Sequence, residues 1–286
     1  MSEPLPALVS TAWLAERLGR PKLRVVDASW YLPTARRDAR AEYLVGHIPG
    51  AVFFDLDENS DSSTDLPHML PDADAFARRM SKLGIDGEDD IVVYDGSGSH
   101  LSAARVWWMF RAFGHDRVGV LDGGIAAWRK EGRPLESGPV ARPAGRFRAG
   151  LRPGQVRTFE EVLALTRSGA EQIVDARPAG RFAGRDPEPR PGLRAGHIPG
   201  SRSVPSTSLV DAEGLLLPTD ELRRRFESAG VDPRRPVVAT CGSGTSACAV
   251  LFALHLLGQS RGTLYDGSWS EWGRRADLPV ATGDAG

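Results

Sequence analysis

A cysteine in a glycine-rich loop is the residue of this chain best suited to covalent chemistry. Cys241 opens the segment Cys241-Gly-Ser-Gly-Thr-Ser246, between a β-branched run at 236–239 and an apolar helical pattern at 247–256. Ligands of open α/β sheets bind where strands end and helices begin. A glycine-rich turn lets backbone N–H groups converge there, and the helix N-terminus adds positive potential. The pattern predicts a Cys241 thiolate in an anion-binding loop; a structural cysteine beside a tight turn stays the alternative.

Few other residues of this sequence could bind a metal or take part in redox chemistry. Cys248, the second cysteine, lies on the apolar helical pattern, and we interpret it as a packed thiol. The six histidines are scattered, so we expect no metal site and no cofactor. Two cysteines in one segment cannot cross-link distant parts of the chain, which favours a reducing, cytoplasmic compartment.

The chain contains an internal duplication. Four motifs recur in the same order, and the spacing between the copies changes by only a few residues, as small loop insertions would produce. Gly-His-Ile-Pro-Gly recurs without change, and because both copies keep its histidine we interpret that residue as a turn anchor. The matching pairs are Val25–Ala28 with Ile173–Ala176, Gly46–Gly50 with Gly196–Gly200, Ile91–Gly98 with Val237–Gly244, and Leu121–Gly124 with Tyr265–Ser268.

Each copy alternates short β-branched runs with helical patterns, which is typical of an α/β domain with a parallel sheet and helices on both faces. The expected strands include 23–26, 91–94, 172–174 and 236–239. Thr158 begins a capping box, and Thr219 is expected to cap a helix that ends before Gly230. The sequence therefore predicts two tandem domains, 1–138 and 157–286, joined by a Pro- and Gly-rich linker at 139–156.

Composition excludes several classes of protein. The chain has 286 residues, which is enough for two domains, and 36 basic residues balance 37 acidic ones. A nucleic-acid-binding protein would carry a basic excess, so none is expected as a partner. No apolar run approaches the ~20 residues that cross a bilayer, so no membrane association is expected, and the N-terminus lacks the pattern of a secretory signal.

The duplication, the two Gly-His-Ile-Pro-Gly motifs and the loop at 241–246 resemble the rhodanese family, over nearly the whole chain. The segment Asp266-Gly-Ser-Trp-Ser-Glu-Trp272 also resembles the C-terminal signature of that family. The resemblance implies two rhodanese-like domains, with a persulfide carried on Cys241. In the first copy Asp95 stands at the cysteine position. A carboxylate cannot carry sulfane sulfur, so we expect that copy to be catalytically silent.

Within the family, the loop resembles the branch that uses 3-mercaptopyruvate. Gly242 and Ser243 are neutral, whereas rhodaneses that use thiosulfate usually carry basic residues there. The segments around Arg181 and Arg190 also resemble this branch, in which the matching arginines bind the substrate carboxylate. Arg181 and Arg190 lie in a stretch that we interpret as an insertion specific to the second copy.

The resemblance implies roles for further residues. Gly242, Gly244, Thr245 and Ser246 are expected to line the substrate loop, and Ser243 to move a proton. Thr245-Ser246 replaces the Val-Thr that is common in the family, although Ser246 keeps the hydroxyl. An Asp and a His matching Asp57 and His68 are proposed in this branch to assist the cysteine; a polar loop without such a role is the alternative.

The resulting hypothesis is a sulfurtransferase that passes sulfur from 3-mercaptopyruvate through a Cys241 persulfide to a thiol, cyanide or protein acceptor. The nearest alternative is a thiosulfate:cyanide sulfurtransferase, which has the same fold and cysteine but another donor. A cysteine-based phosphatase would need an arginine closing a longer loop, where this chain has Ala247-Cys-Ala249. A non-catalytic rhodanese-like binding module is disfavoured because the second copy keeps its cysteine.

Overall fold

The computed structural model describes residues 4–284 and divides the chain into two compact units. Each unit takes most of its residues from one copy of the repeat, together with a short segment from the other half of the sequence. Unit 1 comprises Met1–Asp61, Leu70–Arg152 and Ala212–Leu216, and unit 2 comprises Ser62–Met69, Pro153–Asp211 and Leu217–Gly286. The bounds that the repeat predicts, 1–138 and 157–286, stay a proposal for the duplicated domains themselves.

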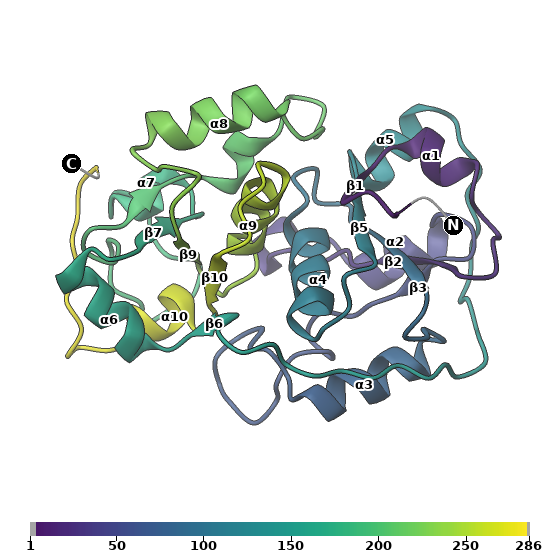
Figure 1. Cartoon of the computed structure of the whole chain (residues 1–286), viewed down its shortest axis with the longest axis horizontal. Helices are drawn as coiled ribbons and strands as arrows, with labels where there is room; N and C mark the ends of the chain where they lie inside the picture. Colours follow the sequence, from purple (N-terminus) through teal and green to yellow (C-terminus); the bar gives the residue numbers. More distant parts are fainter. Residues whose placement is uncertain (1–3, 285–286) are drawn as a thin grey trace. The chain divides into compact units, whose positions relative to one another are not determined.

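Unit 1 is built on a five-stranded parallel sheet with strand order β1-β5-β4-β2-β3. The strands, drawn in Figure 1, are β1 Leu8–Val9, β2 Leu23–Asp27, β3 Val52–Phe53, β4 Asp90–Tyr94 and β5 Val118–Leu121. The helices are α1 Thr11–Ala15, α2 Ala39–Val45, α3 Ala73–Lys82, α4 Leu101–Ala112 and α5 Gly124–Lys130, with a 3-10 turn η1 at Pro33–Ala35.

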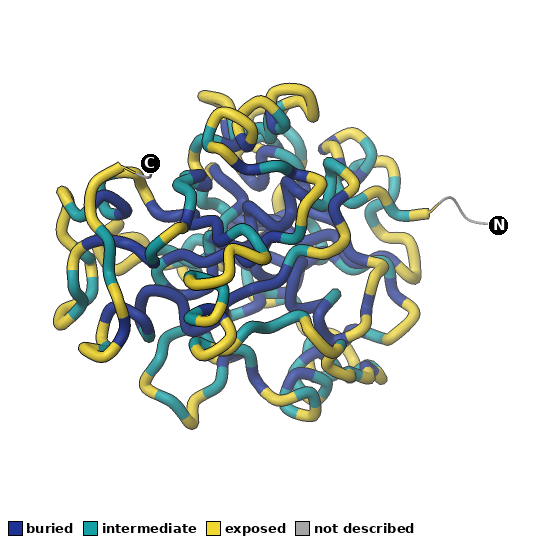
Figure 2. Tube along the Cα trace, turned by 60° about the vertical axis from the view of Figure 1, so that its left-hand side comes forward, coloured by how far each residue is buried: buried dark blue, intermediate teal, exposed yellow. Residues whose placement is uncertain are grey.

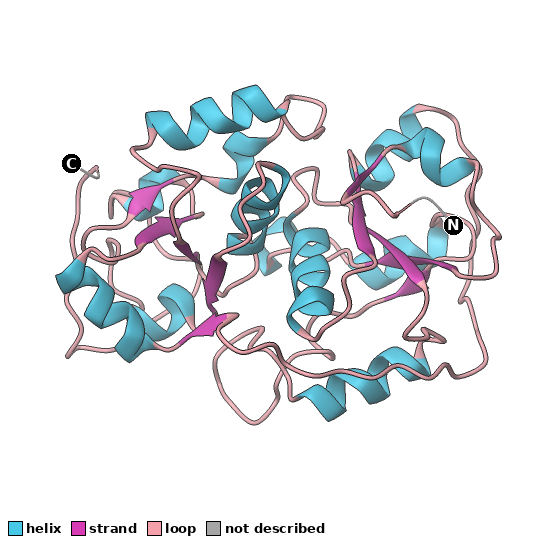
Figure 3. Ribbon diagram, viewed as in Figure 1, coloured by secondary structure: helices cyan, strands magenta, loops and turns pink. Residues whose placement is uncertain are grey.

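Unit 2 repeats this plan with strand order β6-β10-β9-β7-β8, again parallel throughout. Its strands, shown in magenta in Figure 3, are β6 Val156–Arg157, β7 Gln172–Asp175, β8 Arg202–Ser203, β9 Val237–Thr240 and β10 Gly262–Tyr265. Its helices are α6 Phe159–Ser168, α7 Ala179–Phe182, α8 Thr219–Ser228, α9 Ala247–Leu256 and α10 Ser268–Trp272, with a 3-10 turn η2 at Ser206–Leu209. The two identical strand orders confirm the predicted α/β class and the duplication.

Helices cover both faces of the unit 2 sheet. Ile173 and Val238 share an apolar cluster with Val162 of α6 and Trp272 of α10, on one face. Alternate residues of a strand point to opposite faces, and α9 packs on β9 and β10 from the other side. The central strand β9 is buried along its whole length. Figure 2 shows the buried segments of the chain in dark blue and the exposed ones in yellow. This burial on both faces explains why the strands read as short, continuous apolar runs.

The repeated histidines anchor turns, as expected. His197 Nδ1 donates to the carbonyl oxygen of Phe182 at 2.8 Å, and its ring stacks on that phenyl ring with centroids 3.7 Å apart. His47 makes the same pair of contacts with Tyr43, at 2.8 Å and 4.1 Å. The same arrangement in both units supports a structural role for both residues.

Two helix starts test the capping predictions. Thr158 forms the predicted capping box, because its side chain accepts from the Glu161 N–H and Glu161 accepts from the Thr158 N–H. The expectation for Thr219 is wrong: Thr219 is the first residue of α8, and Pro218 occupies the N-cap position. The Pro218 carbonyl already accepts from the Leu222 N–H at 2.9 Å, so the helix begins one residue earlier.

The predicted linker has no helix or strand between α5 and β6 within the described residues. Its first part is held along unit 1, since the Gly145 N–H donates to Ser81 O at 2.8 Å and the Arg152 N–H to Ala112 O at 2.8 Å. Phe147 is buried against Phe76 and Phe110. The chain up to Arg152 is therefore part of unit 1.

Candidate active site

Cys241 follows β9 directly and begins the loop that leads into α9, as the sequence predicts. Its side chain is buried, with 1% of the residue exposed. Gly244 lies at φ 74°, a left-handed conformation that glycine adopts without strain. The loop closes on α9, where the Cys248 N–H donates to Thr245 O at 3.1 Å. Cys248 is fully buried and its thiol lies 3.3 Å from Gly244 O, which confirms the interpretation of a packed thiol.

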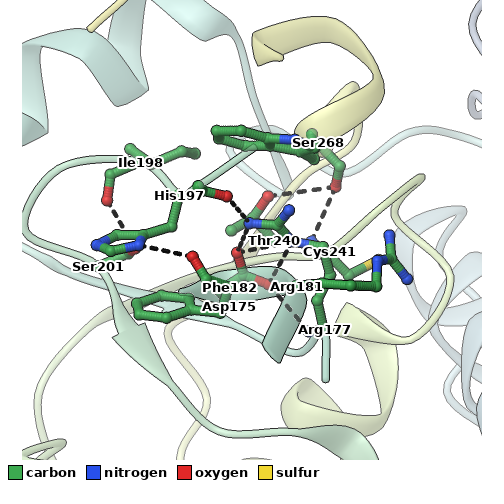
Figure 4. A network of polar contacts seen from close by, with 12 residues as sticks. Asp175, Arg177, Arg181, Phe182, His197, Ile198, Ser201, Thr240, Cys241 and Ser268 are labelled. Atoms are coloured by element: carbon green, nitrogen blue, oxygen red, sulfur yellow. Dashed lines mark hydrogen bonds and ion pairs between the residues drawn. The ribbon is translucent and has the colours of Figure 1, made fainter. Parts of the chain in front are cut away.

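Ser268, at the start of α10, fixes the shape of this loop through hydrogen bonds (Figure 4). Its Oγ accepts from the Cys241 N–H at 3.1 Å and from the Gly244 N–H at 3.0 Å, and it donates to Tyr265 O at 2.8 Å. The next turn adds two donors to Gly242 O, the Ser270 N–H at 2.9 Å and the Ser270 Oγ at 2.6 Å. The loop is therefore held by its buried side, and its other backbone groups are left for a ligand.

Several loop amides lack an acceptor in the described part of the chain. Because these N–H groups follow one another around a glycine-rich turn at a helix N-terminus, they form the kind of concave surface that binds anions. The loop amides that donate to no acceptor within residues 4–284 are those of Gly242, Ser243, Thr245 and Ser246. The arrangement can stabilise negative charge on a sulfur attached to, or approaching, Cys241.

Two arginines predicted from the sequence converge on this loop. A Cβ atom built on Gly242 would lie 3.1 Å from Arg181 Nη2 and 4.0 Å from Arg190 Nη1. Arg181 comes from α7, and Arg190 from the coil that follows it. Arginine is suited to a carboxylate because its planar fork donates two parallel hydrogen bonds. The structure therefore places two guanidinium groups beside the residue that follows the cysteine.

Arg181 is oriented by a buried charge network that sequence reasoning missed. Glu188 accepts from Arg181 Nη2 and, at 3.2 Å, from Arg181 Nε; its other oxygen accepts from Arg177 Nη1 at 2.7 Å. Arg177 also pairs with Asp175 at 2.6 Å and lies 4.4 Å over the ring of Trp269. Although burial lowers the pKa of Arg177, its contacts with Asp175 and Glu188 outweigh it and the pKa is raised.

His68 contacts the loop at 241–246, which we call the active loop, although it comes from the first half of the sequence. The segment Ser62–Met69 belongs to unit 2, and His68 Nδ1 lies 2.9 Å from Ser243 Oγ and 3.2 Å from Thr245 Oγ1. The His68 ring is buried and its backbone has φ 62°, in the left-handed region. Ser246 sits at the N-cap position of α9 without a side-chain cap bond.

Asp57 belongs to unit 1, where its carboxylate accepts from Trp30 Nε1 at 3.0 Å. Its predicted cooperation with His68 stays a prediction. The structure brings the other predicted site residues together around the loop of unit 2. These residues are Cys241, Gly242, Ser243, Gly244, Thr245, Ser246, Arg181, Arg190 and His68.

The matching loop of unit 1 is filled by its own side chains. The Asp95 carboxylate accepts from the Ser97 N–H at 2.9 Å, from Ser97 Oγ at 2.7 Å and from the Ala103 N–H at 2.8 Å. A further donor is Ser102 Oγ at 3.2 Å. The Asp95 carboxylate is therefore the acceptor for a backbone amide of this loop and for one in the first turn of α4.

The expectation of an arginine-bearing insertion in the second copy needs correction. Asp27 to His47 spans only two residues fewer than Asp175 to His197, so unit 1 has a counterpart to this stretch. That counterpart contains Arg37, whose Nη1 donates to Gly96 O at 3.0 Å and whose Nη2 pairs with Glu42 at 2.6 Å. The units differ in which side chains this stretch presents, and not in the presence of the stretch.

Comparison with known proteins identifies the family to which the chain belongs. The model of the rhodanese-like domain matches twice, at residues 10–131 and 158–275, so the chain belongs to the rhodanese family. No helix in the described part of the chain is long and apolar enough to cross a membrane.

The particular relatives are sulfurtransferases. The human 3-mercaptopyruvate sulfurtransferase is 46% identical over 275 residues, covering 94% of this chain and 93% of the relative. The enzyme of the same name from Escherichia coli K12 is 47% identical, covering 95% and 96%. Bovine thiosulfate sulfurtransferase is 45% identical, covering 94% and 93%. The crystal structure of SseA, a 3-mercaptopyruvate sulfotransferase from Escherichia coli, matches with a TM-score of 0.85 and 44% identity, covering 93% of this chain and 99% of that one.

Proposed function

We propose that this protein is a sulfurtransferase that takes sulfur from 3-mercaptopyruvate and carries it as a persulfide on Cys241. One observation carries the proposal. Cys241 is the first residue of a loop whose amides are available to an anion, and Arg181 and Arg190 lie beside Gly242 of that loop. A nucleophile, a set of oxyanion-type donors and a carboxylate clamp are the three parts that such a transfer needs.

The first half-reaction begins with attack of the Cys241 thiolate on the thiol sulfur of 3-mercaptopyruvate. A sulfur–sulfur bond forms as the carbon–sulfur bond breaks, and the electron pair of the broken bond passes to the substrate carbon. The products are a Cys241 persulfide and the enolate of pyruvate, which takes up a proton. Loop amides stabilise the anionic sulfur throughout, because backbone dipoles aimed at a developing charge need no reorganisation.

We assign the protonation of the enolate to Ser243 and His68. Ser243 Oγ and His68 Nδ1 are 2.9 Å apart, a distance over which a proton passes along a hydrogen bond. We infer that the serine hydroxyl hands a proton to the enolate carbon and regains one from the imidazole. Thr245 Oγ1, 3.2 Å from the same nitrogen, holds the ring in place. Asp57 is retained as the proposed partner of His68.

The choice of donor rests on the residues of the site. Relatives named for mercaptopyruvate and for thiosulfate are almost equally identical to this chain, at 46% and 45%. Thiosulfate carries its charge close to the attacked sulfur, and its recognition would favour cations within the loop. Gly242 and Ser243 are neutral, and the arginines lie beside the loop, where the carboxylate of mercaptopyruvate can reach them. Thiosulfate is the second candidate donor.

In the second half-reaction the outer sulfur passes to an acceptor. A thiolate, cyanide or a protein thiol attacks the outer sulfur, and the Cys241 thiolate leaves. We propose the cytoplasm as the compartment, since a persulfide carrier needs a reduced thiol and a reducing compartment maintains it.

Substitution of the carrier tests the proposal. We expect Cys241→Ser to abolish sulfur transfer and Cys248→Ser to keep most of it, since only the first thiol opens the loop. Intact-mass spectrometry after donor treatment is expected to show one added sulfur atom in wild type and in Cys248→Ser, removed again by cyanide. Full activity of the folded Cys241→Ser variant would end the proposal.

The donor is tested by kinetics with both substrates. Arg181→Ala and Arg190→Ala each remove charge-assisted hydrogen bonds worth about 1.5–3 kcal/mol. That corresponds to a loss of roughly ten- to a hundredfold in kcat/KM with mercaptopyruvate. A wild type that prefers thiosulfate, or two arginine variants with unchanged mercaptopyruvate kinetics, would show that the assignment to the mercaptopyruvate branch is wrong.

A further inference from the structure

Glu188 is a buried carboxylate held between two guanidinium groups. Its side chain is 3% exposed, and its two oxygens are divided between Arg177 and Arg181. Arg181 is the arginine nearest to the loop, with Nη2 3.1 Å from the Cβ position of Gly242. Glu188 is therefore separated from the loop by one side chain, that of Arg181, and its charge would act on an anion bound at the loop through that side chain.

The charges of this network alternate in sign. Asp175, Arg177, Glu188 and Arg181 form a continuous chain of ion pairs in which two negative groups balance two positive ones. Arg190 stands beside the same loop position, 4.0 Å from the Cβ position of Gly242. The positive charge of Arg181 that faces the loop is thus cancelled by Glu188 behind it, while its N–H groups remain available as donors.

The effect of this cancellation depends on the charge of the ligand. Electrostatic energy scales with the product of the charges, so a dianion loses twice as much as a monoanion when a negative charge is placed behind Arg181. Mercaptopyruvate presents one carboxylate, and thiosulfate carries two negative charges. A neutral residue at position 188 would therefore favour thiosulfate more than it favours mercaptopyruvate.

We propose that Glu188 is a specificity determinant that makes the Cys241 site select monoanionic donors over dianionic ones. The inference rests on the proposed function, because it concerns the donor of the same site. This role differs from that of the arginines beside the loop. Arg181 and Arg190 attract anions, whereas Glu188 limits the charge of the anion that the site accepts.

The test separates charge from positioning with three variants. Glu188→Gln removes the charge and keeps the shape, whereas Glu188→Asp keeps the charge and shortens the reach to Arg181. Glu42→Gln is the matched control, since Glu42 pairs with Arg37 beside the loop of the silent copy. The quantity measured is the ratio of kcat/KM for thiosulfate to kcat/KM for mercaptopyruvate, with cyanide as acceptor.

We expect Glu188→Gln to raise this ratio about three- to tenfold, as one extra unit of charge at a partly solvated site would do. The higher ratio is expected to come from a lower KM for thiosulfate, and the effect is expected to shrink as ionic strength increases. Glu188→Asp and Glu42→Gln are expected to leave the ratio unchanged. An unchanged ratio in Glu188→Gln, or an equal change in Glu188→Asp, would overturn the proposal.

A binding measurement keeps the inference separate from the proposed function. Calorimetric titration with methanesulfonate, a monoanion, and sulfate, a dianion of similar size, needs no turnover. We expect wild type to bind methanesulfonate at least as tightly as sulfate, and the order to reverse in Glu188→Gln. Wild type that binds sulfate more tightly would refute the role of Glu188, even where the variant does not fold. Absence of sulfur transfer from mercaptopyruvate, with the anion preference intact, would refute the proposed function alone.

Discussion

Removal of the Ser268 hydroxyl is the sharpest test of how the loop is held. Ser268 is fully buried, and its Oγ accepts from two backbone N–H groups, those of Cys241 and Gly244. Ser268→Ala leaves both donors without their partner. A buried donor that loses its acceptor costs about 1–3 kcal/mol, so we expect the free energy of unfolding to fall by about 2–5 kcal/mol.

A second substitution at the same position isolates the hydroxyl from the backbone. Ser268 has φ 51°, a left-handed conformation that costs a non-glycine residue about 1–2 kcal/mol. Ser268→Gly loses the hydroxyl but relieves this strain, so we expect it to be less destabilised than Ser268→Ala by about 1 kcal/mol. The first copy has Gly124 at this position, which shows that the turn accepts glycine.

Ser270→Ala provides the matched control. Ser270 Oγ donates to Gly242 O, but the Ser270 N–H donates to the same oxygen at 2.9 Å. The acceptor keeps one partner when the hydroxyl is removed, and we expect a loss of about 1 kcal/mol. The order of stability is therefore expected to be wild type, Ser270→Ala, Ser268→Gly and Ser268→Ala.

Three measurements check this prediction. Urea titration of the intact chain gives the free energy of unfolding, and hydrogen exchange of the peptide 241–246 reports the loop amides directly. Intact-mass spectrometry follows persulfide formation, whose rate we expect to fall by about ten- to a hundredfold in Ser268→Ala because the thiol is displaced. A loss below about 0.5 kcal/mol with unchanged exchange of the loop amides would refute the argument that Ser268 shapes the loop.

Two further predictions concern unit 1. Asp95→Asn weakens the hydrogen bonds to the Ser97 and Ala103 N–H groups, so we expect the free energy of unfolding to fall by about 1–3 kcal/mol while turnover stays near wild type. A large loss of turnover in a folded Asp95→Asn protein would show that the first copy is catalytic. Burial lowers the pKa of His115 below its usual 6.5. As the unfolded chain takes up this proton first, the neutral His115 contributes stability that is present above about pH 6.5 and lost as the pH falls through its lowered pKa. Urea midpoints between pH 7.5 and 5 are expected to decline less steeply in His115→Gln than in wild type, and equal slopes would contradict this assignment.

The strands and the duplication were predictable because they depend on local patterns. Buried parallel strands read as continuous apolar runs, and β9 was expected at 236–239 and is found at Val237–Thr240. The loop and its cysteine follow from the strand–loop–helix order, which places Cys241 at a strand end. A repeat also transfers every assignment from one copy to the other, which is why one strand order describes both sheets.

The network behind the site was not predicted, since it depends on tertiary contacts between residues of ordinary polar type. A signal was nevertheless present in the differences between the copies. Ser29 is replaced by Arg177 two positions after the repeated aspartate, and Gly124 is replaced by Ser268 after the second Asp-Gly pair. Each substitution exchanges a small residue for one that contacts the active loop or supports Arg181.

The exchange of segments between the units brings residues from both halves of the sequence to the loop of Cys241. Ser62–Met69 lies in unit 2 and brings His68 to Ser243, while Ala212–Leu216 lies in unit 1, where the Leu216 N–H donates to Asp122 at 2.9 Å. The first copy has Asp95 at the position of the cysteine, and the Asp95 carboxylate accepts hydrogen bonds within its own loop. That copy supplies instead the histidine beside the active loop. A C-terminal half on its own would keep Cys241 and the arginines but lack His68, and with it the partner of the Ser243 hydroxyl.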